Sequence, residues 1–383
     1  MSKTEIPSIR FRGFDDAWEQ RKLGEVATFI NGRAYSQPEL LSSGKYKVLR
    51  VGNFYTNDSW YYSDLELGEK YYADYGDLLY TWSATFGPHI WLGDRAIYHY
   101  HIWKINLSDQ LEKQFAVQLL EQDRANILSS KNGSTMVHIT KEGMEQKDVI
   151  ISPNTKEQQE IGAFFLQLDN LITLHQRKFE KLTNVKKSML EKMFPRNGSC
   201  YPEIRFKGFT DPWEQRKVRE VTDRYDNLRI PVAANLRVAG TTPYYGANGI
   251  QDYVEGYTHD GEFILVAEDG ANDLKNYPVK CVKGRIWVNN HAHVLQGKCA
   301  YADNQFLAYA ISQADIESLL VGGGRVKLNA ETLMDIELLL PIKDEQIQIR
   351  HYLARLDNLI TLHQRELEKL QNIKKALLEK MFV

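Results

Sequence analysis

The chain has 383 residues, of which 43% are hydrophobic and 26% charged, and its formal net charge at pH 7 is −2. These values are typical of a globular protein with more than one domain, and they exclude a disordered or fibrous chain and a strongly basic nucleic-acid binder. Three cysteines and the absence of a long apolar run argue against a disulfide framework and a membrane span, so we expect a cytoplasmic protein without a membrane partner.

The first element in chain order is a framework segment, residues 1–26, which contains the block IRFRGFDDAWEQRKLGEV at Ile9–Val26. A similar block, IRFKGFTDPWEQRKVREV, returns at Ile204–Val221 within a second framework segment, residues 196–221. The sequences that follow the two blocks share almost no identity. A repeated framework with divergent inserts predicts one architecture used twice, a pseudo-two-fold repeat that carries two different surfaces.

The first insert, residues 27–152, is predicted to be a variable domain rich in strands. Runs such as KYKVLRVGNFY and GDLLYTWS combine β-branched and aromatic residues and are bounded by Gly, Asn and Asp. A helix is predicted over Gln110–Ser129. His99 and His101 form a His-x-His pair near the middle of this domain.

A long helix is predicted over residues 153–195. We expect Thr155 to be its N-cap, with Gln158 three residues later as in a capping box. Apolar side chains recur every seven residues along it, with a second apolar row four residues on, which is the pattern of a coiled-coil seam. Lys186 interrupts that seam, and Pro195 ends the helix.

The second insert, residues 222–341, is predicted to be a variable domain with the same fold. Its runs GEFILVAEDGA and RIWVNNHAHVLQ again favour strands, and a helix is predicted over Asp303–Leu320. The pair His291 and His293 is matched to the His-x-His pair of the first domain. The fold class is therefore α/β of the α+β kind, with two mixed, strand-rich domains.

A second long helix is predicted over residues 342–383. Its sequence LDNLITLHQRELEKLQNIKKALLEKMF, from Leu356 to Phe382, is identical to Leu168–Phe194 at 21 of 27 positions. A lone helix of this kind favours a homodimeric coiled coil, but two matched copies favour an intramolecular, antiparallel coiled coil in which the two variable domains lie at opposite ends. Lys374 interrupts this copy of the seam. The predicted seam contains Leu168, Ile172, His175, Leu182, Leu356, Ile360, His363 and Leu370, with His175 and His363 meeting near its centre.

These features together resemble the specificity subunit of type I restriction-modification systems. The residues that carry the resemblance are WEQRK near each domain start, YYGANGIQDYVEGYTHDGEFILVAEDG followed by RIWVNNHAHVL, and the two helices with Glu-Gln and LDNLITLHQR. The resemblance covers essentially the whole chain. It implies that the variable domains are target-recognition domains, each reading one half of a split double-stranded DNA site, and that the coiled coil sets the spacing between them.

The resemblance also implies partners and cofactors. Two methyltransferase (modification) subunits are expected to dock on the coiled coil, and restriction/translocase subunits are expected to join outside them, in a complex for DNA methylation and phage defence. The chain itself is expected to be non-catalytic and to hold no cofactor. S-adenosylmethionine, ATP and Mg²⁺ are expected on the partner subunits.

The sequence contains no complete motif for a methyltransferase, an ATPase or a metal-dependent reaction. The nearest match to the Asn- or Asp-Pro-Pro-aromatic loop of an amino-methyltransferase is Asp211-Pro212-Trp213, and its counterpart Asp16-Ala17-Trp18 lacks the proline, so the motif belongs to the framework. No phosphate-binding loop of the Walker type is present. Two cysteines and two histidines, Cys281, His291, His293 and Cys299, lack the close Cys-x-x-Cys spacing of ordinary zinc sites, so we expect no metal.

Polar residues on loops that flank the shared strands are the candidates for DNA contact, because side chains of this type hydrogen-bond to base edges and phosphates. The alternative for each of them is a structural role in a turn. The candidates are Asn53, Tyr55, Asn57, Trp82, Ser83, Thr85, Ser134 and Thr135 in the first domain, and Asn248, Glu268, Asp269, Asn272, Lys275, Asn289, Asn290, Arg325 and Lys327 in the second.

Two other functions remain open on the sequence alone. A non-catalytic, two-headed adaptor would bind protein or RNA with its variable domains and use the coiled coil as a spacer. A free-standing enzyme would need the His-x-His pairs as its acid or base, but the two halves share no set of acid, base and nucleophile.

Overall fold

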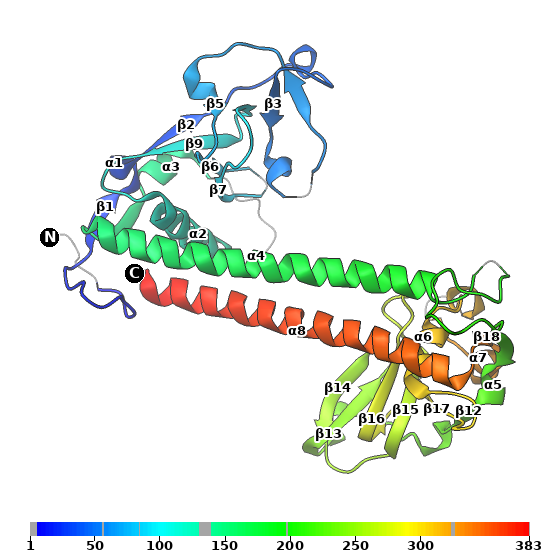
Figure 1. Cartoon of the computed structure of the whole chain (residues 1–383). Helices are drawn as coiled ribbons and strands as arrows, with labels where there is room; N and C mark the ends of the chain where they lie inside the picture. Colours follow the sequence, from blue (N-terminus) through cyan, green and yellow to red (C-terminus); the bar gives the residue numbers. More distant parts are fainter. Residues whose placement is uncertain are drawn as a thin grey trace. The chain divides into compact units, whose positions relative to one another are not determined.

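The computed structural model describes residues 6–55, 57–83, 85–129, 139–196, 198–322 and 326–382. It divides the chain into two units, Met1–Gln176 with Arg365–Val383 and Arg177–Gln364. Each unit contains one framework segment, one variable domain and parts of both long helices (Figure 1). None of the helices in the described residues is long and apolar enough to cross a membrane.

The first unit contains two four-stranded sheets, in the orders β2-β9-β6-β7 and β4-β3-β8-β5, and a separate pair formed by β1 and β10. Parallel pairing of β3 with β8 is the exception among otherwise antiparallel strands. The main elements are β1 (Glu19–Lys22), α1 (Leu23–Val26), β2 (Ala27–Asn31), β3 (Tyr46–Leu49), η2 (Val51–Phe54), β4 (Tyr61–Ser63), β5 (Tyr72–Ala73), β6 (Leu78–Thr81), β7 (Gly87–Ile90), β8 (Ala96–Tyr98), β9 (Ile102–Leu107), α2 (Lys113–Ser129), α3 (Lys141–Glu145), β10 (Asp148–Ile151) and α4 (Thr155–Lys192).

The second unit contains one six-stranded sheet, in the order β12-β17-β15-β16-β13-β14, and the separate pair β11 and β18. The order β12-β17-β15 repeats β2-β9-β6, so the two variable domains share their central strands, as predicted. The main elements are β11 (Glu214–Lys217), α5 (Val218–Val221), β12 (Thr222–Arg224), η4 (Asp226–Leu228), β13 (Ala239–Gly246), β14 (Gly249–Val254), β15 (His259–Ala267), β16 (Val279–Val288), β17 (Ala292–Gly297), α6 (Asn304–Ser312), α7 (Ala330–Asp335), β18 (Glu337–Leu340) and α8 (Lys343–Met381).

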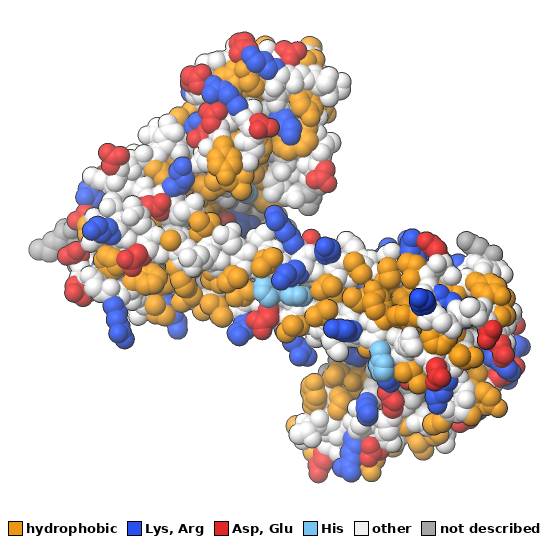
Figure 2. Space-filling model, in the orientation of Figure 1, with side chains coloured by type: hydrophobic (Ala, Val, Ile, Leu, Met, Phe, Trp, Pro, Cys, Tyr) orange, Lys and Arg blue, Asp and Glu red, His pale blue; other side chains and the backbone are white. Residues whose placement is uncertain are grey.

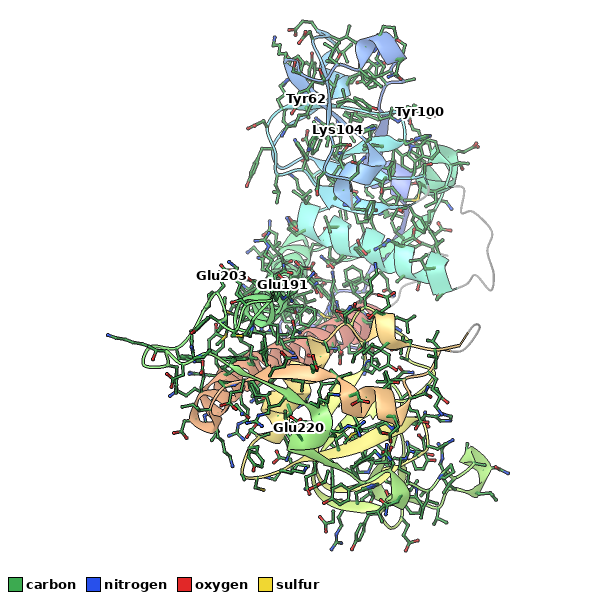
Figure 3. The ribbon with its side chains drawn as sticks, turned by 90° about the vertical axis from the view of Figure 1, so that its right-hand side faces the viewer. Tyr62, Tyr100, Lys104, Glu191, Glu203 and Glu220 are labelled. Atoms are coloured by element: carbon green, nitrogen blue, oxygen red, sulfur yellow. The ribbon has the colours of Figure 1, made fainter. Side chains whose placement is uncertain are left out.

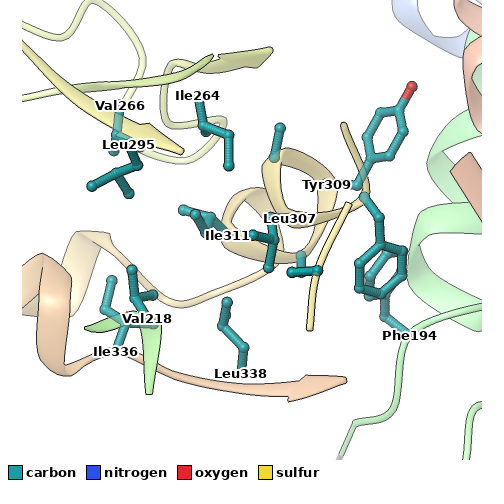
Figure 4. Close-up of a cluster of buried hydrophobic side chains, with 14 of the residues drawn as sticks. Phe194, Val218, Ile264, Val266, Leu295, Leu307, Tyr309, Ile311, Ile336 and Leu338 are labelled. Atoms are coloured by element: carbon teal, nitrogen blue, oxygen red, sulfur yellow. The ribbon is translucent and has the colours of Figure 1, made fainter. Parts of the chain in front are cut away.

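The core of the second unit lies between the central strands, α6 and the long helices. Figure 4 shows Ile264 and Leu295 from the sheet facing Leu307 of α6, with Val218 and Leu338 on the other side of that helix. Helix α6 ends at Ser312, earlier than the predicted Leu320, while α2 extends to Ser129 as predicted. The mixed, strand-rich fold with helices packed on the sheet is confirmed.

A buried glutamine at the start of each long helix ties that helix to its variable domain. The Gln158 side-chain amide donates to the carbonyl oxygens of Gln110 and Ser152, both at 2.8 Å. Gln346 makes the equivalent bonds, including one to the Tyr301 carbonyl at 3.0 Å. These buried amides fix where each helix leaves its domain, because an unsatisfied buried amide would cost free energy.

The predicted N-cap of the first helix was wrong by one residue. The side-chain oxygen of Asn154 accepts a hydrogen bond from the Lys156 N–H at 3.0 Å, and Thr155 is the first helical residue. Asparagine caps as well as threonine does, so the sequence pattern allowed both positions.

The two long helices pack together within each unit. In the first unit the beginning of α4 lies against the end of α8, so the helices run antiparallel. The Lys374 ammonium group is 2.6 Å from the Asp169 carboxylate, which also accepts a hydrogen bond from Gln118 of α2. Lys374, which interrupts the predicted seam, therefore has an acidic partner on the other helix.

The second unit repeats this arrangement with the helices exchanged. Lys186 of α4 pairs with Asp357 of α8, and the Tyr309 hydroxyl of α6 donates to Asp357 at 2.6 Å. Each variable domain is thus attached to both helices through one aspartate of the repeated LDNL sequence. The predicted intramolecular, antiparallel helix pair is confirmed; His175 belongs to the first unit and His363 to the second, and their meeting stays a prediction.

The framework segments close the far ends of the helices. The Ile204 N–H donates to the Lys192 carbonyl at 2.9 Å, and Lys192 pairs with Glu203, which is labelled in Figure 3. In the first unit the Ile9 N–H donates to the Lys380 carbonyl at 3.1 Å. The start of the chain therefore caps α8 as the internal connector caps α4.

Candidate nucleic-acid interface

The hydrogen-bond registers of the two variable domains identify equivalent positions in their loops. In the first domain Thr81 faces Ile102, and in the second Ala267 faces Ala292. The parallel strand pairs agree, because β3–β8 and β13–β16 end at the corresponding residues. The turn at residues 99–101, between β8 and β9, is therefore equivalent to the turn at residues 289–291, between β16 and β17.

This register corrects the predicted match between the His-x-His pairs. His101 is equivalent to His291, but His99 corresponds to Asn289, and His293 corresponds to Trp103. The pairs also do not lie along one face of a strand, because His99 and His101 lie in the turn, and only His293 is on β17. Matching by residue letter shifted the alignment by two positions.

In the first domain, two asparagine candidates hold a tight turn after β3. The Asn53 amide nitrogen donates to the carbonyls of Asn57 and Ser59, at 3.0 and 2.9 Å, and its oxygen accepts from the Arg50 N–H at 3.1 Å. The Asn57 oxygen accepts from the N–H and hydroxyl of Ser59. Both side chains are thus used in the turn, as the structural alternative expects.

Tyr55 joins this turn to strands β6 and β7. Its hydroxyl is 3.1 Å from the Thr81 hydroxyl and 3.2 Å from His89 Nε2. Burial, and to a smaller extent a nearby arginine charge, lowers the pKa of His89 to about 4, so this imidazole is neutral at pH 7. Of the loop candidates, Ser83 is half-buried and Thr85 is exposed.

Trp82 belongs to an aromatic cluster at the end of β6. Its ring stacks on Trp103 at 5.7 Å between centroids, and Trp103 stacks on Tyr80 at 5.9 Å. The Trp82 Nε1–H donates to the Tyr100 carbonyl at 2.9 Å, and its ring meets His101 edge-on. This cluster supports an aromatic surface that ends at the exposed side chain of Tyr100.

The equivalent place in the second domain holds an ionic network. Glu268, equivalent to Trp82, accepts from Arg229 at 2.6 Å and pairs with Lys327 at 2.7 Å. His293, equivalent to Trp103, lies 3.6 Å from Glu268 and donates to Asp226 at 2.7 Å. The same backbone therefore carries aromatic stacking in one domain and charge pairing in the other.

His293 is the centre of this network. Its Nδ1 faces the Asp226 carboxylate, its Nε2 faces the Leu328 carbonyl at 2.9 Å, and the side chain is buried. Although burial acts to raise them, the hydrogen bond from His293 lowers the pKa of Asp226, and those from Lys327 and Arg229 lower the pKa of Glu268. Both carboxyl groups are thus held ionised beside the loop at residues 326–328.

Three other candidates of the second domain, Asn248, Asp269 and Asn272, lie near the end of β15 and make hydrogen bonds there. The Asn248 amide nitrogen donates to the Gly270 carbonyl, and its oxygen accepts from the Asn272 N–H, both at 2.9 Å. The Asp269 carboxylate is 2.6 Å from His291 Nδ1. The loops after β13, β15 and β16 thereby form one polar surface.

The last candidates of the second domain differ in exposure. Asn289 is buried; its side-chain nitrogen donates to Gln251 at 3.4 Å, and its side-chain oxygen accepts from the His291 N–H of the same turn at 2.8 Å. Asn290 and Lys275 are exposed. Ser134, Thr135 and Arg325 lie outside the described residues. DNA contact stays a prediction for all of these candidates.

Sequence reasoning missed Tyr100, His89 and Arg229. Tyr100 lies between His99 and His101, and the sequence interpretation considered only these two histidines of the His-x-His pattern. His89 and Arg229 are far in the sequence from the candidates that they contact, Tyr55 and Glu268, and only folding brings them together. A register-based alignment of the two domains, rather than one based on shared letters, would have pointed to Tyr100.

Among the described residues, no group of three or more His, Cys, Asp and Glu side chains is arranged to hold a metal ion. Charged side chains of both signs are interspersed over the visible face, without one continuous basic patch (Figure 2).

Comparisons with known proteins agree on the family. Residues 15–184 and 210–372 both match the model described as type I restriction modification DNA specificity domain. The protein named "Putative type I restriction enzyme specificity subunit S.HindORF215P" of Haemophilus influenzae is 41% identical over 154 residues, which is 40% of this chain and 39% of that protein. The type I restriction enzyme MjaVIII specificity subunit of Methanocaldococcus jannaschii is 21% identical over 94% of this chain and 91% of its own length.

A solved structure has a similar fold over the full chain. The S subunit of a type I restriction-modification system from M. genitalium covers 99% of both chains with a TM-score of 0.74, at 15% sequence identity. At this identity the similarity concerns the fold alone.

Proposed function

This chain belongs to the type I restriction modification DNA specificity family, with one specificity domain in each half, and from this premise we propose that it is the DNA-recognition subunit of a type I restriction-modification complex. Each variable domain reads one half of a bipartite site on double-stranded DNA, and the helix pair sets the spacer between the halves. The chain itself performs no chemistry and acts in the cytoplasm.

The observation that carries this proposal is the contrast between equivalent loops. The central strands and their hydrogen-bond registers repeat, while Trp82 in the first domain is replaced by Glu268 in the second. A shared backbone with different side chains at its loops is what two different base sequences require, because base edges are distinguished by the chemistry of the contacting side chains.

Docking of two modification subunits is supported by a surface that occurs twice. Leu171 and Leu174 of α4 are exposed, and so are their copies Leu359 and Leu362 of α8. The surrounding sequence LDNLITLHQR is identical in both helices. Two equal apolar surfaces fit two copies of one partner. These subunits, and the restriction/translocase subunits, would carry S-adenosylmethionine, ATP and Mg²⁺.

Exchange of one variable domain tests whether each domain recognises one half of a bipartite DNA site. Residues 27–152 are replaced by the corresponding insert of a related specificity subunit, the variant is co-expressed with the methyltransferase, and the methylated sites are sequenced. We expect one half of the site to change, and the matched exchange of residues 222–341 to change the other half. If either exchange altered both halves, the modular reading would be wrong.

The net charge of −2 favours a second candidate, an adaptor that binds protein or RNA with its two domains. A salt series separates the two. DNA affinity of the chain with its methyltransferase should fall with salt at a slope near −0.9 per neutralised phosphate, and more steeply than for the chain alone, because the partner supplies most phosphate contacts. A complex without any salt-dependent affinity for duplex DNA would support the adaptor.

A further inference from the structure

Tyr100 and Asn290 occupy the same position in the two variable domains. Each is the central residue of a three-residue turn that joins equivalent strands. The N–H before the tip donates to the neighbouring parallel strand in both domains, from His99 to Leu49 at 2.9 Å and from Asn289 to the Tyr245 carbonyl at 3.1 Å. The carbonyl of the residue after the tip accepts a hydrogen bond from the N–H of the residue that follows β6 or β15: His101 accepts from Trp82 at 3.1 Å, and His291 accepts from Glu268 at 2.9 Å.

The fold does not require a particular side chain at this position. The hydrogen bonds that shape the turn are made by backbone atoms and, in the second domain, by the side chain of Asn289 before the tip. None of them uses the side chain of the tip residue itself, and the same turn accommodates a tyrosine and an asparagine. Both side chains are exposed, and the Tyr100 side chain is 40% exposed. A position that is structurally unconstrained, exposed and different between the domains is suited to recognition.

The surroundings give each tip a defined chemistry. The Tyr100 ring lies against His101, with centroids 4.0 Å apart, and against Trp82 at 6.3 Å, so it extends the aromatic cluster to the surface. Figure 3 labels Tyr100 in the first domain. Asn290 lies between Asn289 and His291, whose side chains are engaged with Gln251 and Asp269, and no hydrogen bond of its own amide occurs within the described part of the chain.

We propose that the two turn tips are equivalent base-reading positions in the major groove, and that Asn290 reads an adenine while Tyr100 contacts the methyl group of a thymine. An asparagine amide matches the N6 donor and N7 acceptor of adenine, and an aromatic ring offers the apolar contact that a thymine methyl takes. This inference rests on the proposed function and adds the residue and the type of base in each half-site.

The test uses the full chain assembled with its methyltransferase subunits. Binding is measured to bipartite duplexes in which each base pair is varied in turn, for the wild type and for Tyr100→Ala and Asn290→Ala. The matched controls are Tyr75→Ala, at a tyrosine that is 75% exposed in the same unit, and Asn235→Ala, at an exposed asparagine of the second unit. Thermal unfolding of each variant verifies that it is folded.

We expect Asn290→Ala to reduce discrimination roughly 5- to 150-fold at one A·T pair of the second half-site and to leave the first half-site unchanged. Replacing that adenine by 7-deazaadenine should weaken the wild type but not the variant. Tyr100→Ala should act on the first half-site alone, and replacing one thymine by uracil should reproduce its effect. Tyr100→Phe, which keeps the ring, should retain the wild-type preference.

Unchanged base preferences in both alanine variants, with a wild type that reads a bipartite site, would overturn this inference and leave the proposed function intact. Wild-type complex without any sequence preference would overturn the proposed function, and the inference with it. An equal loss in the control variants would also overturn the assignment, because the effect would then not belong to the turn tips.

Discussion

The guanidinium group of Arg205 donates two hydrogen bonds to the carboxylate of Glu345, each at 2.8 Å. Glu345 is fully buried at the start of α8, and Arg10 with Glu157 repeats the pair at the start of α4. The pair connects a framework segment to a long helix in each unit.

Replacing Arg205 by alanine should lower the free energy of unfolding by about 3 to 5 kcal/mol, because Glu345 would be left as an uncompensated buried charge. Urea unfolding followed by circular dichroism measures this change. The matched control is Arg216→Ala, whose partner Glu214 is on the surface, and which should cost less than about 1 kcal/mol. Equal effects of the two variants would contradict the role of the buried pair.

Replacing Phe382 by alanine should destabilise the first unit. The Phe382 ring is buried and lies 5.0 Å from the Phe115 ring and 6.1 Å from the Trp18 ring, measured between centroids. The loss should be about 3 to 5 kcal/mol, the usual cost of removing a core phenylalanine ring. Hydrogen exchange should locate the loss in the first unit. The exposed Leu92→Ala is the control, and protection lost first in the second unit would refute this prediction.

Replacing His293 by alanine should cost about 2 to 4 kcal/mol, because it removes the buried ring that lies between the Asp226 carboxylate and the Leu328 carbonyl and leaves these buried polar groups with fewer hydrogen-bond partners. The effect should be visible in the second unit as lost exchange protection of β17. His351→Ala, at an exposed histidine of α8, is the matched control and should be nearly neutral. A stability equal to that of the control would mean that the network does not hold the domain together.

The first unit should lose stability as the pH falls below about 6.5. Burial lowers the pKa of His89 and His99 to about 4, so between these values the unfolded chain binds protons that the folded chain does not. The free energy of unfolding then decreases as pH decreases through this window. Urea midpoints measured across it should fall less steeply for His89→Gln. An unchanged slope in that variant would exclude His89 as a source of the pH dependence.

The repeat and the heptads were sufficient to predict much of the architecture. Apolar residues at seven-residue spacing in two copies required a partner helix, and the other copy was the nearest one. The partners of Lys186 and Lys374 could not be predicted, because they depend on how the antiparallel helices are offset. Asp357 and Asp169 are paired with these lysines only once that offset is fixed.

The candidate site was predicted less completely than the architecture. Asn53 and Asn57 have the composition of a ligand-binding loop, but their hydrogen bonds close a turn. The equivalence of Trp82 and Glu268 cannot be recognised from the amino-acid sequence, because the two side chains share neither charge nor shape. It is defined by the strand register, which depends on long-range pairing.

The first unit is assembled from two segments that are far apart in the sequence, Met1–Gln176 and Arg365–Val383, and this affects how the protein is made. During synthesis the first variable domain leaves the ribosome before the whole of Arg177–Gln364 is translated, which takes on the order of 10 to 40 s at typical rates. Until Phe382 appears, the apolar surfaces of Trp18 and Phe115 lack their final cover. The core of the first unit thus cannot be completed before its second segment is translated, and a nascent chain released early would present those surfaces to chaperones or to other chains.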